Sequence, residues 1–167
     1  MLACAYILCL PIPREYIKPT EQGIREAIQT GVAAGYPIVD VHVDILDGSY
    51  HAVDSSEIAF KLAGSMAFKE AAQKSGIRIL EPIMRLEIET PEEHMGDIIG
   101  DISSRRGNVV QMDVQGGEAK LKANVPLAEL FGYTTALRSI SRGRATNSME
   151  PSHFEAVPDA IQKTILE

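Results

Sequence analysis

Residues 38–57 constrain the fold of this chain more than any other stretch. Between residues 39 and 45 apolar and polar side chains alternate: Val39, Val41, Val43 and Ile45 are separated by Asp40, His42 and Asp44. An apolar residue at every second position is typical of a strand with one buried face and one face in water. The alternation therefore predicts a half-buried strand over residues 38–46.

A short polar loop follows the predicted strand, and a helical pattern follows the loop. Asp54 and Glu57 stand just before the apolar run 58–60, with the three-residue spacing of a capping box. We expect Asp54 to accept hydrogen bonds from the first free amides of a helix over residues 55–74. A loop fixed at both ends is a rigid projection, and its tip carries Gly48, Ser49, Tyr50 and His51.

Composition sets broad bounds on the function. A length of 167 residues suits one ordinary domain or two small ones, and 45% hydrophobic with 23% charged residues is typical of a globular chain. The net charge of −7 argues against a general nucleic-acid coat, because phosphate neutralisation needs a basic surface. A specific RNA contact through a few local cations remains open.

The N-terminal segment is apolar and holds both cysteines, Cys4 and Cys9. Two cysteines so close together build neither a disulfide framework nor a zinc ribbon, so we interpret them as reduced thiols of a cytoplasmic protein. Residues 1–10 lack the basic leader and the cleavage site of a signal peptide and are too short to span a membrane. We expect them to form a strand or the start of a fragment.

Two helices and two strands are predicted for residues 1–80. The first helix begins at Pro13 and ends at Gly31 or Gly35, with Ile17, Ile24, Ala27 and Ile28 on one side. The second ends at Gly76, and its predicted inner stripe is Ile58, Leu62, Ala63, Met66 and Ala67. A further strand is expected over residues 77–80.

The pattern restarts after Glu81-Pro82, which we interpret as a boundary between two units. Strands are predicted at 83–89, 108–114, 118–125 and 145–150, with helices starting near Thr90-Pro91 and spanning 127–140. Strand, helix, strand, strand, helix, strand is the order of a ferredoxin-like split βαβ fold. The fold class is therefore α+β, with residues 81–157 as the ferredoxin-like unit and 158–167 as a C-terminal helix.

Catalytic and ligand-binding motifs are scarce. The chain has no Gly-Lys pair, so it lacks a phosphate-binding P-loop, and it has no dinucleotide-binding glycine fingerprint. Gly96 and Gly100 are explained by close helix–sheet packing. Asp40, His42, Asp44, His51 and Asp54 could hold a divalent metal, but an exposed strand face produces the same pattern. We therefore expect no catalytic residue, cofactor or metal ion.

Arginines gather near the ends of the two helices of the second unit. Bidentate phosphate recognition suits arginine, and helix C-terminal charge complementation explains the same positions without a ligand. Both interpretations stay open for Arg105, Arg106, Arg138 and Arg142, and Arg144 lies close by.

Several motifs in fixed order resemble bacterial translation elongation factor G. The segments similar to its fourth domain are Pro13–Ile17, Ala34–Val41, Asp47–His51, Val53–Glu57 and Ala67–Ala71. Those similar to its fifth domain are Leu80–Met84, Gly96–Asp101, Ser104–Gly107, Val125–Glu129, Phe131–Tyr133, Gly143–Ala145 and Ser148–Glu150. The resemblance covers residues 12–166 without a gap.

The resemblance implies a part of a factor that drives tRNA and mRNA translocation on the ribosome. Residues 1–80 would be an incomplete βαβ unit of the ribosomal protein S5 domain 2-like kind, whose tip loop 47–54 enters the decoding region of the small subunit. His51 matches the family's tip histidine, and the implied contacts are Gly48, Ser49, Tyr50, His51 and Asp54. The fifth domain, with Arg105 and Arg106, would lie near the factor-binding rRNA of the large subunit.

Some parts of the full-length family are absent from this chain, and further expectations follow from their absence. The GTPase domain, which binds GTP and magnesium in the full-length family, is absent from this chain, so we expect a C-terminal fragment that hydrolyses no GTP. The alternative is a stand-alone ribosome- or RNA-binding module without translocation activity; a small ligand-binding domain is disfavoured. Missing first strands would expose a sheet edge, so self-association is also expected.

Overall fold

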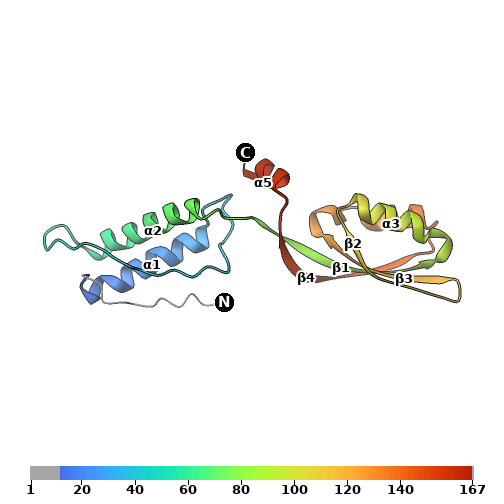
Figure 1. Cartoon of the computed structure of the whole chain (residues 1–167), viewed down its shortest axis with the longest axis horizontal. Coiled ribbons are helices and arrows are strands. Elements are labelled where there is room, and N and C mark those ends of the chain that lie inside the picture. The colour runs from blue at the N-terminus through green and yellow to red at the C-terminus, as the bar shows by residue number, and fades with distance from the viewer. Residues whose placement is uncertain (1–11, 167) are drawn as a thin grey trace. The chain divides into compact units, whose positions relative to one another are not determined.

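The computed structural model describes residues 12–166, which form two compact units (Figure 1). The first unit contains the chain up to Arg78 together with the C-terminal segment from Asp159, and the second contains Ile79–Pro158. The division falls just before β1, Leu80–Pro91, so Glu81-Pro82 lies inside this strand. The C-terminal helix α5, Asp159–Leu166, belongs to the first unit, where Gln162 donates to the carbonyl of Ile77.

The first unit is built on two long helices, α1 (Arg14–Thr30) and α2 (Glu57–Lys74), which lie side by side (Figure 1). Their close approach depends on two glycines. A Cβ built on Gly23 would lie 1.9 Å from the carbonyl oxygen of Lys61, and one on Gly64 would lie 2.7 Å from that of Thr20. The predicted end of the first helix is confirmed, because Gly31 caps α1 with φ +77°.

The start and the inner face of α2 differ from the predictions. Ser56, not Asp54, is the N-cap, and its hydroxyl accepts from the amide of Ala59 at 3.2 Å. The buried residues are Gly64, Phe68 and Ala72, whereas Ile58, Leu62 and Met66 are 72%, 57% and 70% exposed. The helix is apolar on more than one side, so the spacing of large residues did not identify the face that packs on α1.

The segment 38–46 does not form the predicted strand: it has a bend at Asp40, and only Ile45 is a bridge residue. The four strands of the described structure pair only with one another, and Asp40 has a left-handed φ of +54°, which interrupts a regular strand. The alternation itself is confirmed over residues 41–45: Val41, Val43 and Ile45 are half-buried, while His42 and Asp44 are exposed. The strand predicted at 77–80 is likewise absent except for Leu80, which begins β1.

The second unit is a four-stranded antiparallel sheet in the order β2-β3-β1-β4. Along the chain β1 is followed by α3 (Met95–Ser104), β2 (Asn108–Gln115), β3 (Glu118–Pro126), α4 (Tyr133–Ile140) and β4 (Thr146–Ala156). This order and sheet arrangement confirm the predicted ferredoxin-like split βαβ fold and the α+β class.

Two predicted helix boundaries in this unit are wrong. The strand β1 continues through Pro91, and a 3₁₀ turn, Glu92–His94, precedes α3. The predicted helix 127–140 is divided into a 3₁₀ turn, Leu127–Leu130, and α4, because Phe131 is extended and Gly132 is left-handed with φ +75°. Glycine adopts this conformation without the strain that a Cβ would add.

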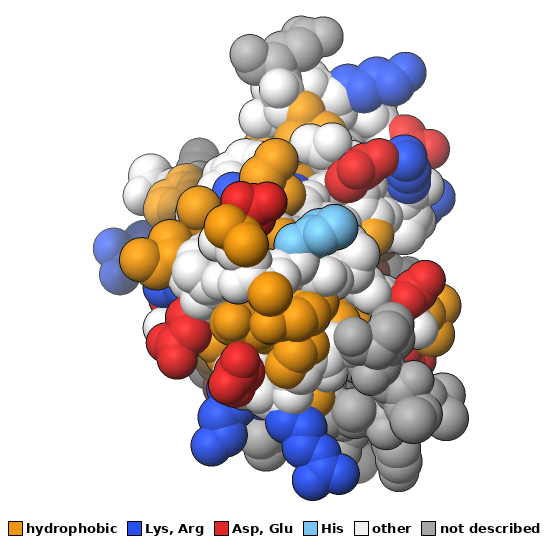
Figure 2. Space-filling view, turned by 90° about the vertical axis from the view of Figure 1, so that its left-hand side faces the viewer, with side chains coloured by type: hydrophobic (Ala, Val, Ile, Leu, Met, Phe, Trp, Pro, Cys, Tyr) orange, Lys and Arg blue, Asp and Glu red, His pale blue; other side chains and the backbone are white. Residues whose placement is uncertain are grey.

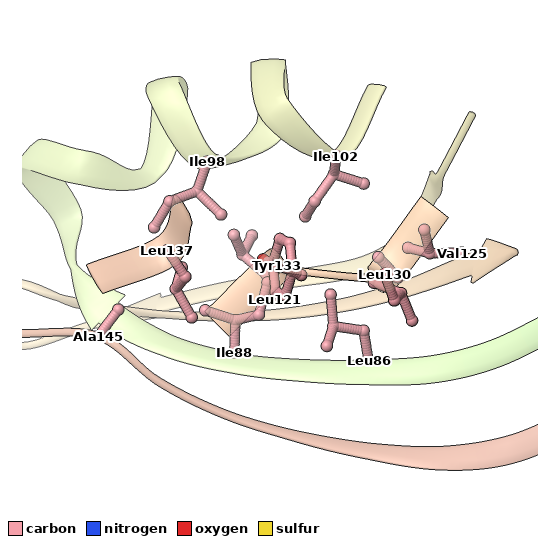
Figure 3. Packing of buried hydrophobic residues seen from close by; sticks show 11 residues of the cluster. Leu86, Ile88, Ile98, Ile102, Leu121, Val125, Leu130, Tyr133, Leu137 and Ala145 are labelled. Carbon is pink, nitrogen blue, oxygen red and sulfur yellow. The ribbon is translucent and has the colours of Figure 1, made fainter. Parts of the chain in front are cut away.

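One apolar core holds the second unit together. Side chains of α3 and α4 point toward the inner face of the sheet, where Leu86, Ile88 and Leu121 lie beneath Ile98 and Ile102 (Figure 3). Eleven buried residues form this cluster, whereas the cluster among the described residues of the first unit has three: Ala27, Phe68 and Ala72. Because buried apolar area is the main stabilising term, this cluster is the principal source of stability within the second unit.

Candidate functional site

The loop between residues 38–46 and α2 is held on both sides. At its start, Gly48 donates its amide to Asp47 Oδ1 at 2.7 Å, and a Cβ on Gly48 would lie 2.2 Å from Ile12 Cδ1. At its end, Ser55 donates its amide to the carbonyl of His51, and the Ser55 hydroxyl accepts from the His51 amide at 3.1 Å. These paired bonds close residues 51–55 into a tight turn.

An aromatic row fixes the loop to the first unit. Tyr16 of α1 stacks on Phe60 of α2 with ring centroids 4.5 Å apart and planes 7° apart, and the Tyr50 ring lies 5.8 Å from that of Tyr16 with planes 32° apart. Desolvation and the neighbouring Glu15 carboxylate raise the pKa of the Tyr16 phenol, so Tyr16 stays uncharged. Sequence reasoning missed Tyr16 and Phe60, because no local spacing connects them to Tyr50.

The loop presents large side chains to solvent. Val53 is 92% exposed and Leu46 is 78% exposed, and Ser49, His51 and Asp54 are exposed as well. Figure 2 views the chain from the loop end and shows hydrophobic side chains in patches, bordered by acidic and basic ones. The predicted tip residues therefore lie together on one short, anchored loop, while Asp54 has no capping role.

The structure gives no support for metal chemistry at the neighbouring acidic residues. His42 Nε2 lies 3.0 Å from Asp44 Oδ1, and both side chains are about half exposed. Within residues 12–166, no group of three or more metal-ligating side chains is placed to hold an ion.

Arg105 and Arg106 lie at the end of α3 and bind within their own unit. Arg105 donates to Asp101 at 2.9 Å and to the carbonyl of Glu129 at 2.7 Å, and its guanidinium lies 5.4 Å from the ring centre of Tyr133. Arg106 binds both oxygens of Glu81, at 3.0 and 2.7 Å, and its Nε donates to Glu129 at 3.1 Å.

These contacts connect three elements of the second unit. The Glu81 and Glu129 carboxylates raise the pKa of the Arg106 guanidinium, so its charge is permanent. Arg106 also has a left-handed φ of +59°, which only a well-supported non-glycine residue keeps. The side chains of Arg105 and Arg106 are 21% and 27% exposed. The two arginines therefore hold parts of the second unit together and also leave some positive charge accessible to solvent.

The remaining arginines of the predicted cluster divide into two groups. Arg144 binds Glu93 and donates to His94 Nε2 at 2.9 Å, so it fixes the start of the α3 region. Arg138 and Arg142 are exposed. Helix C-terminal complementation accounts for Arg138, which lies in the last turn of α4.

Comparisons with known proteins agree with this two-unit arrangement. The family described as "Elongation factor G, domain IV" matches residues 7–76, and that described as "Elongation factor G C-terminus" matches residues 78–165. A crystal structure of a protein from Thermus thermophilus is similar over 94% of this chain, with 38% identity and a TM-score of 0.78. The chain belongs to the elongation factor G family.

The match concerns only part of the longer protein. This chain covers 24% of the Thermus thermophilus chain. The boundary between the two matched families falls where the two units meet, at residues 76–78, and the four-stranded sheet of the second unit is the fold expected for it. In the described residues, no helix is long and apolar enough to cross a membrane.

Proposed function

We propose that this chain is the ribosome-binding C-terminal part of an elongation factor G and supports tRNA and mRNA translocation. The family match over both units supports this, together with one observation: an anchored loop that exposes Tyr50, His51 and Val53. The loop would enter the decoding region of the small subunit and occupy the space that tRNA vacates.

The tip acts by contact in this proposal and not by proton transfer. Aromatic and histidine rings stack on unpaired RNA bases, and hydroxyl and carboxylate groups bind ribose hydroxyls or base edges. Gly48, Ser49, Tyr50, His51 and Asp54 supply these groups within one short loop. The anchor formed by Tyr16 and Phe60 limits the conformational entropy that binding would otherwise remove.

The second unit would lie near the factor-binding rRNA of the large subunit, with Arg105 and Arg106 as phosphate contacts. Both guanidinium groups already bind carboxylates, so an rRNA phosphate must share or exchange their donors. GTP and magnesium would be bound by a GTPase domain joined to this part in the full-length factor, and the chain alone would hydrolyse no GTP.

Co-sedimentation with ribosomes tests the proposal. Substitution His51→Ala and deletion of residues 48–53 should each weaken binding, by about 5- to 100-fold if one base stack is lost. His42→Ala is the matched control, since His42 is also exposed but lies outside the loop. Equal binding by all variants would show that the tip makes no contact.

A second arm examines the arginines and the alternative function. Arg105→Ala and Arg106→Ala should weaken binding while circular dichroism reports a folded unit; if binding requires neither the tip nor these arginines, the proposed contacts are wrong. Fusion of the chain to the GTPase half of a homologous factor separates the two functions. Restored mRNA movement supports translocation, and binding without movement supports the stand-alone module.

A further inference from the structure

The helix α2 is apolar on more than one side, but only one side of it is buried. Phe68 and Ala72 pack against Ala27 of α1, and Gly64 brings the two helices into close contact. A helix that is apolar on all sides is normally buried on all sides, because an exposed apolar face leaves a large area in contact with water. The uncovered side of α2 is therefore a candidate surface for association.

Three large apolar residues form a stripe, here called the α2 stripe, on the side of α2 that faces away from α1. Ile58, Leu62 and Met66 follow one another at four-residue intervals, so they lie on one face of the helix. Leu62 precedes and Met66 follows the buried Gly64 by two residues, which places each of them about 160° around the helix from it. All three are more than half exposed, and the neighbouring Val53 is almost fully exposed. None of them lines the apolar groove of about 710 Å³ on another side of α2, so the stripe is a separate surface.

The two ends of α2 carry opposite charges that have no partner within residues 12–166. Asp54 and Glu57 lie at the N-terminal end, Lys69 lies toward the C-terminal end, and all three are exposed and free of ion pairs in this part of the chain. The other charges of the C-terminal end neutralise each other, because Lys74 binds Glu70 at 2.6 Å. Two copies of this helix placed antiparallel would bring the acidic end of each next to the free lysine of the other.

We propose that two copies of this chain form a dimer through the α2 stripe, with their α2 helices antiparallel. The stripe is symmetric about its middle residue, so a two-fold axis at Leu62 places Leu62 against the partner's Leu62 and Ile58 against the partner's Met66. Lys69 lies about 10 Å along the helix from this axis, which brings the partner's Lys69 level with the segment from Asp54 to Glu57. The opposite partial charges at the ends of the two helices also lie side by side in this arrangement.

A second copy fits this surface because one helix supplies both the apolar stripe and both of the complementary charges. The interface is small. A helix pair with three layers of apolar side chains buries less area than a standard protein interface of about 1,600 Å², so we expect a weak dimer with a dissociation constant of about 10–100 µM. The dimer would therefore form only in concentrated solution and would dissociate on dilution.

Sedimentation equilibrium of the full chain from about 1 µM to about 500 µM tests the proposal. The average mass should rise from that of a monomer to that of a dimer over this range. Leu62→Glu should weaken the dimer by about tenfold or more, because two carboxylates would meet at the two-fold axis. Met112→Glu is the matched control, since Met112 is also exposed but lies on the edge strand β2 of the second unit, and it should leave the dissociation constant unchanged.

Disulfide trapping tests the direction of the two helices. In a background of Cys4→Ser and Cys9→Ser, a mixture of Ile58→Cys and Met66→Cys chains should form a disulfide-linked dimer faster than either chain alone. Faster trapping of Ile58→Cys alone would indicate parallel helices and overturn the proposal. Charge reversal gives a second readout: Lys69→Glu should weaken the dimer at low salt by about 2- to 5-fold, and addition of Asp54→Lys should restore it.

A chain that stays monomeric up to about 500 µM would overturn the proposal. It also fails if Met112→Glu abolishes association and Leu62→Glu does not, because the exposed sheet edge would then be the interface. Circular dichroism of Leu62→Glu and of a second stripe variant, Met66→Lys, distinguishes loss of the dimer from loss of the fold. Monomeric variants that keep their helix content support the proposal, and a dimer that survives both substitutions contradicts it.

Discussion

Arg106 combines three carboxylate contacts with a left-handed backbone, and these two features have opposite effects on stability. We expect Arg106→Ala to destabilise the second unit by about 1–3 kcal/mol, since it leaves the partly buried Glu81 unpaired and keeps the strained φ. Arg106→Gly should be less destabilising than Arg106→Ala by about 1 kcal/mol, because glycine accepts this φ. Urea denaturation measures both.

Arg138→Ala is the matched control for the arginine prediction. Arg138 is exposed in the last turn of α4, so its removal should change the free energy of unfolding by less than about 0.5 kcal/mol. Equal losses for Arg138→Ala and Arg106→Ala would contradict the structural role of the Glu81 contact.

Substitution by alanine should destabilise the protein at a glycine in a close helix contact and stabilise it at an exposed helical glycine. Gly23→Ala places a methyl group against the backbone of Lys61, so we expect the first unit to lose about 2–3 kcal/mol or more. Gly100→Ala lies in exposed helix interior with nothing within 4 Å of the new methyl, and it should gain up to about 1 kcal/mol. Thermal unfolding that shows the same sign for both would contradict the packing described.

The sequence showed which glycines and arginines could matter, but it did not show which contacts they make. The packing explanation of Gly96 and Gly100 is wrong, because both are exposed and open, whereas Gly23 and Gly64 make the close helix contact. Spacing alone does not reveal which glycine meets a neighbour. Similarly, the partners of Arg106 are 23 and 25 residues away in sequence, so helix-end complementation was the only local explanation visible.

Substitutions at Ser56 and Asp54 test which residue caps the N-terminus of α2. Ser56→Ala should destabilise the first unit by about 1 kcal/mol, because its hydroxyl accepts the Ala59 amide. Asp54→Ala lies two residues earlier in the turn and should change the free energy of unfolding by less than half as much. Chemical denaturation followed by helix circular dichroism distinguishes them, and a larger effect of Asp54→Ala would restore the capping box predicted from sequence.

The contact between α1 and α2 should give the first unit a pH-dependent stability. A hydrogen bond from Lys61 at 2.7 Å holds the pKa of Glu26 below its ordinary value of 4.5. Because the folded-state pKa is the lower one, this stabilisation is present above pH 4.5 and is lost as the pH falls through the folded-state value.

Denaturation between pH 7 and pH 3 checks this expectation. Glu26→Gln should flatten the pH dependence most, and Lys61→Gln somewhat less, because a hydrogen bond from Gln22 also lowers the pKa of Glu26. The double variant should be no flatter than Glu26→Gln. Additive effects of the two substitutions would show that the pair is not coupled.

The boundaries of helices and strands agreed with the sequence pattern only in elements that pack one face against a neighbouring element. The strands of the second unit were predicted to within a few residues except β4, which extends six residues further, to Ala156. In α2 the apolar residues surround the helix, so periodicity selected a face that is exposed. The segment 38–46 had the pattern of a strand, but a pattern does not supply the pairing partner that makes a strand.

The two units should differ in stability. The second buries eleven residues in one cluster, while the first buries three among the described residues. We therefore expect amides of Leu86 and Leu121 to exchange with solvent about 100-fold or more slowly than those of Ala27 and Phe68 under native conditions. Hydrogen exchange measured by NMR checks this, and uniform protection would indicate one cooperative molecule.

For the whole molecule, the sequence predicted the ferredoxin-like topology because each of its elements follows a local pattern in a known order. The sequence did not predict that the C-terminal helix belongs to the first unit. This helix contacts the first unit through Gln162 and Ile77, which are 85 residues apart in the sequence. The tip loop was found from local chemistry, and its aromatic anchor was not.

The chain enters and leaves the second unit through adjacent positions, which has a mechanical consequence. The amide of Val157 bonds to the carbonyl of Ile79, and Leu80 pairs with Ala156 in antiparallel register. A pulling force applied at these two ends loads this pair first and then the next pair along β1 and β4. The sheet would open like a zipper, one pair at a time, at far lower force than if its strands had to slide past one another.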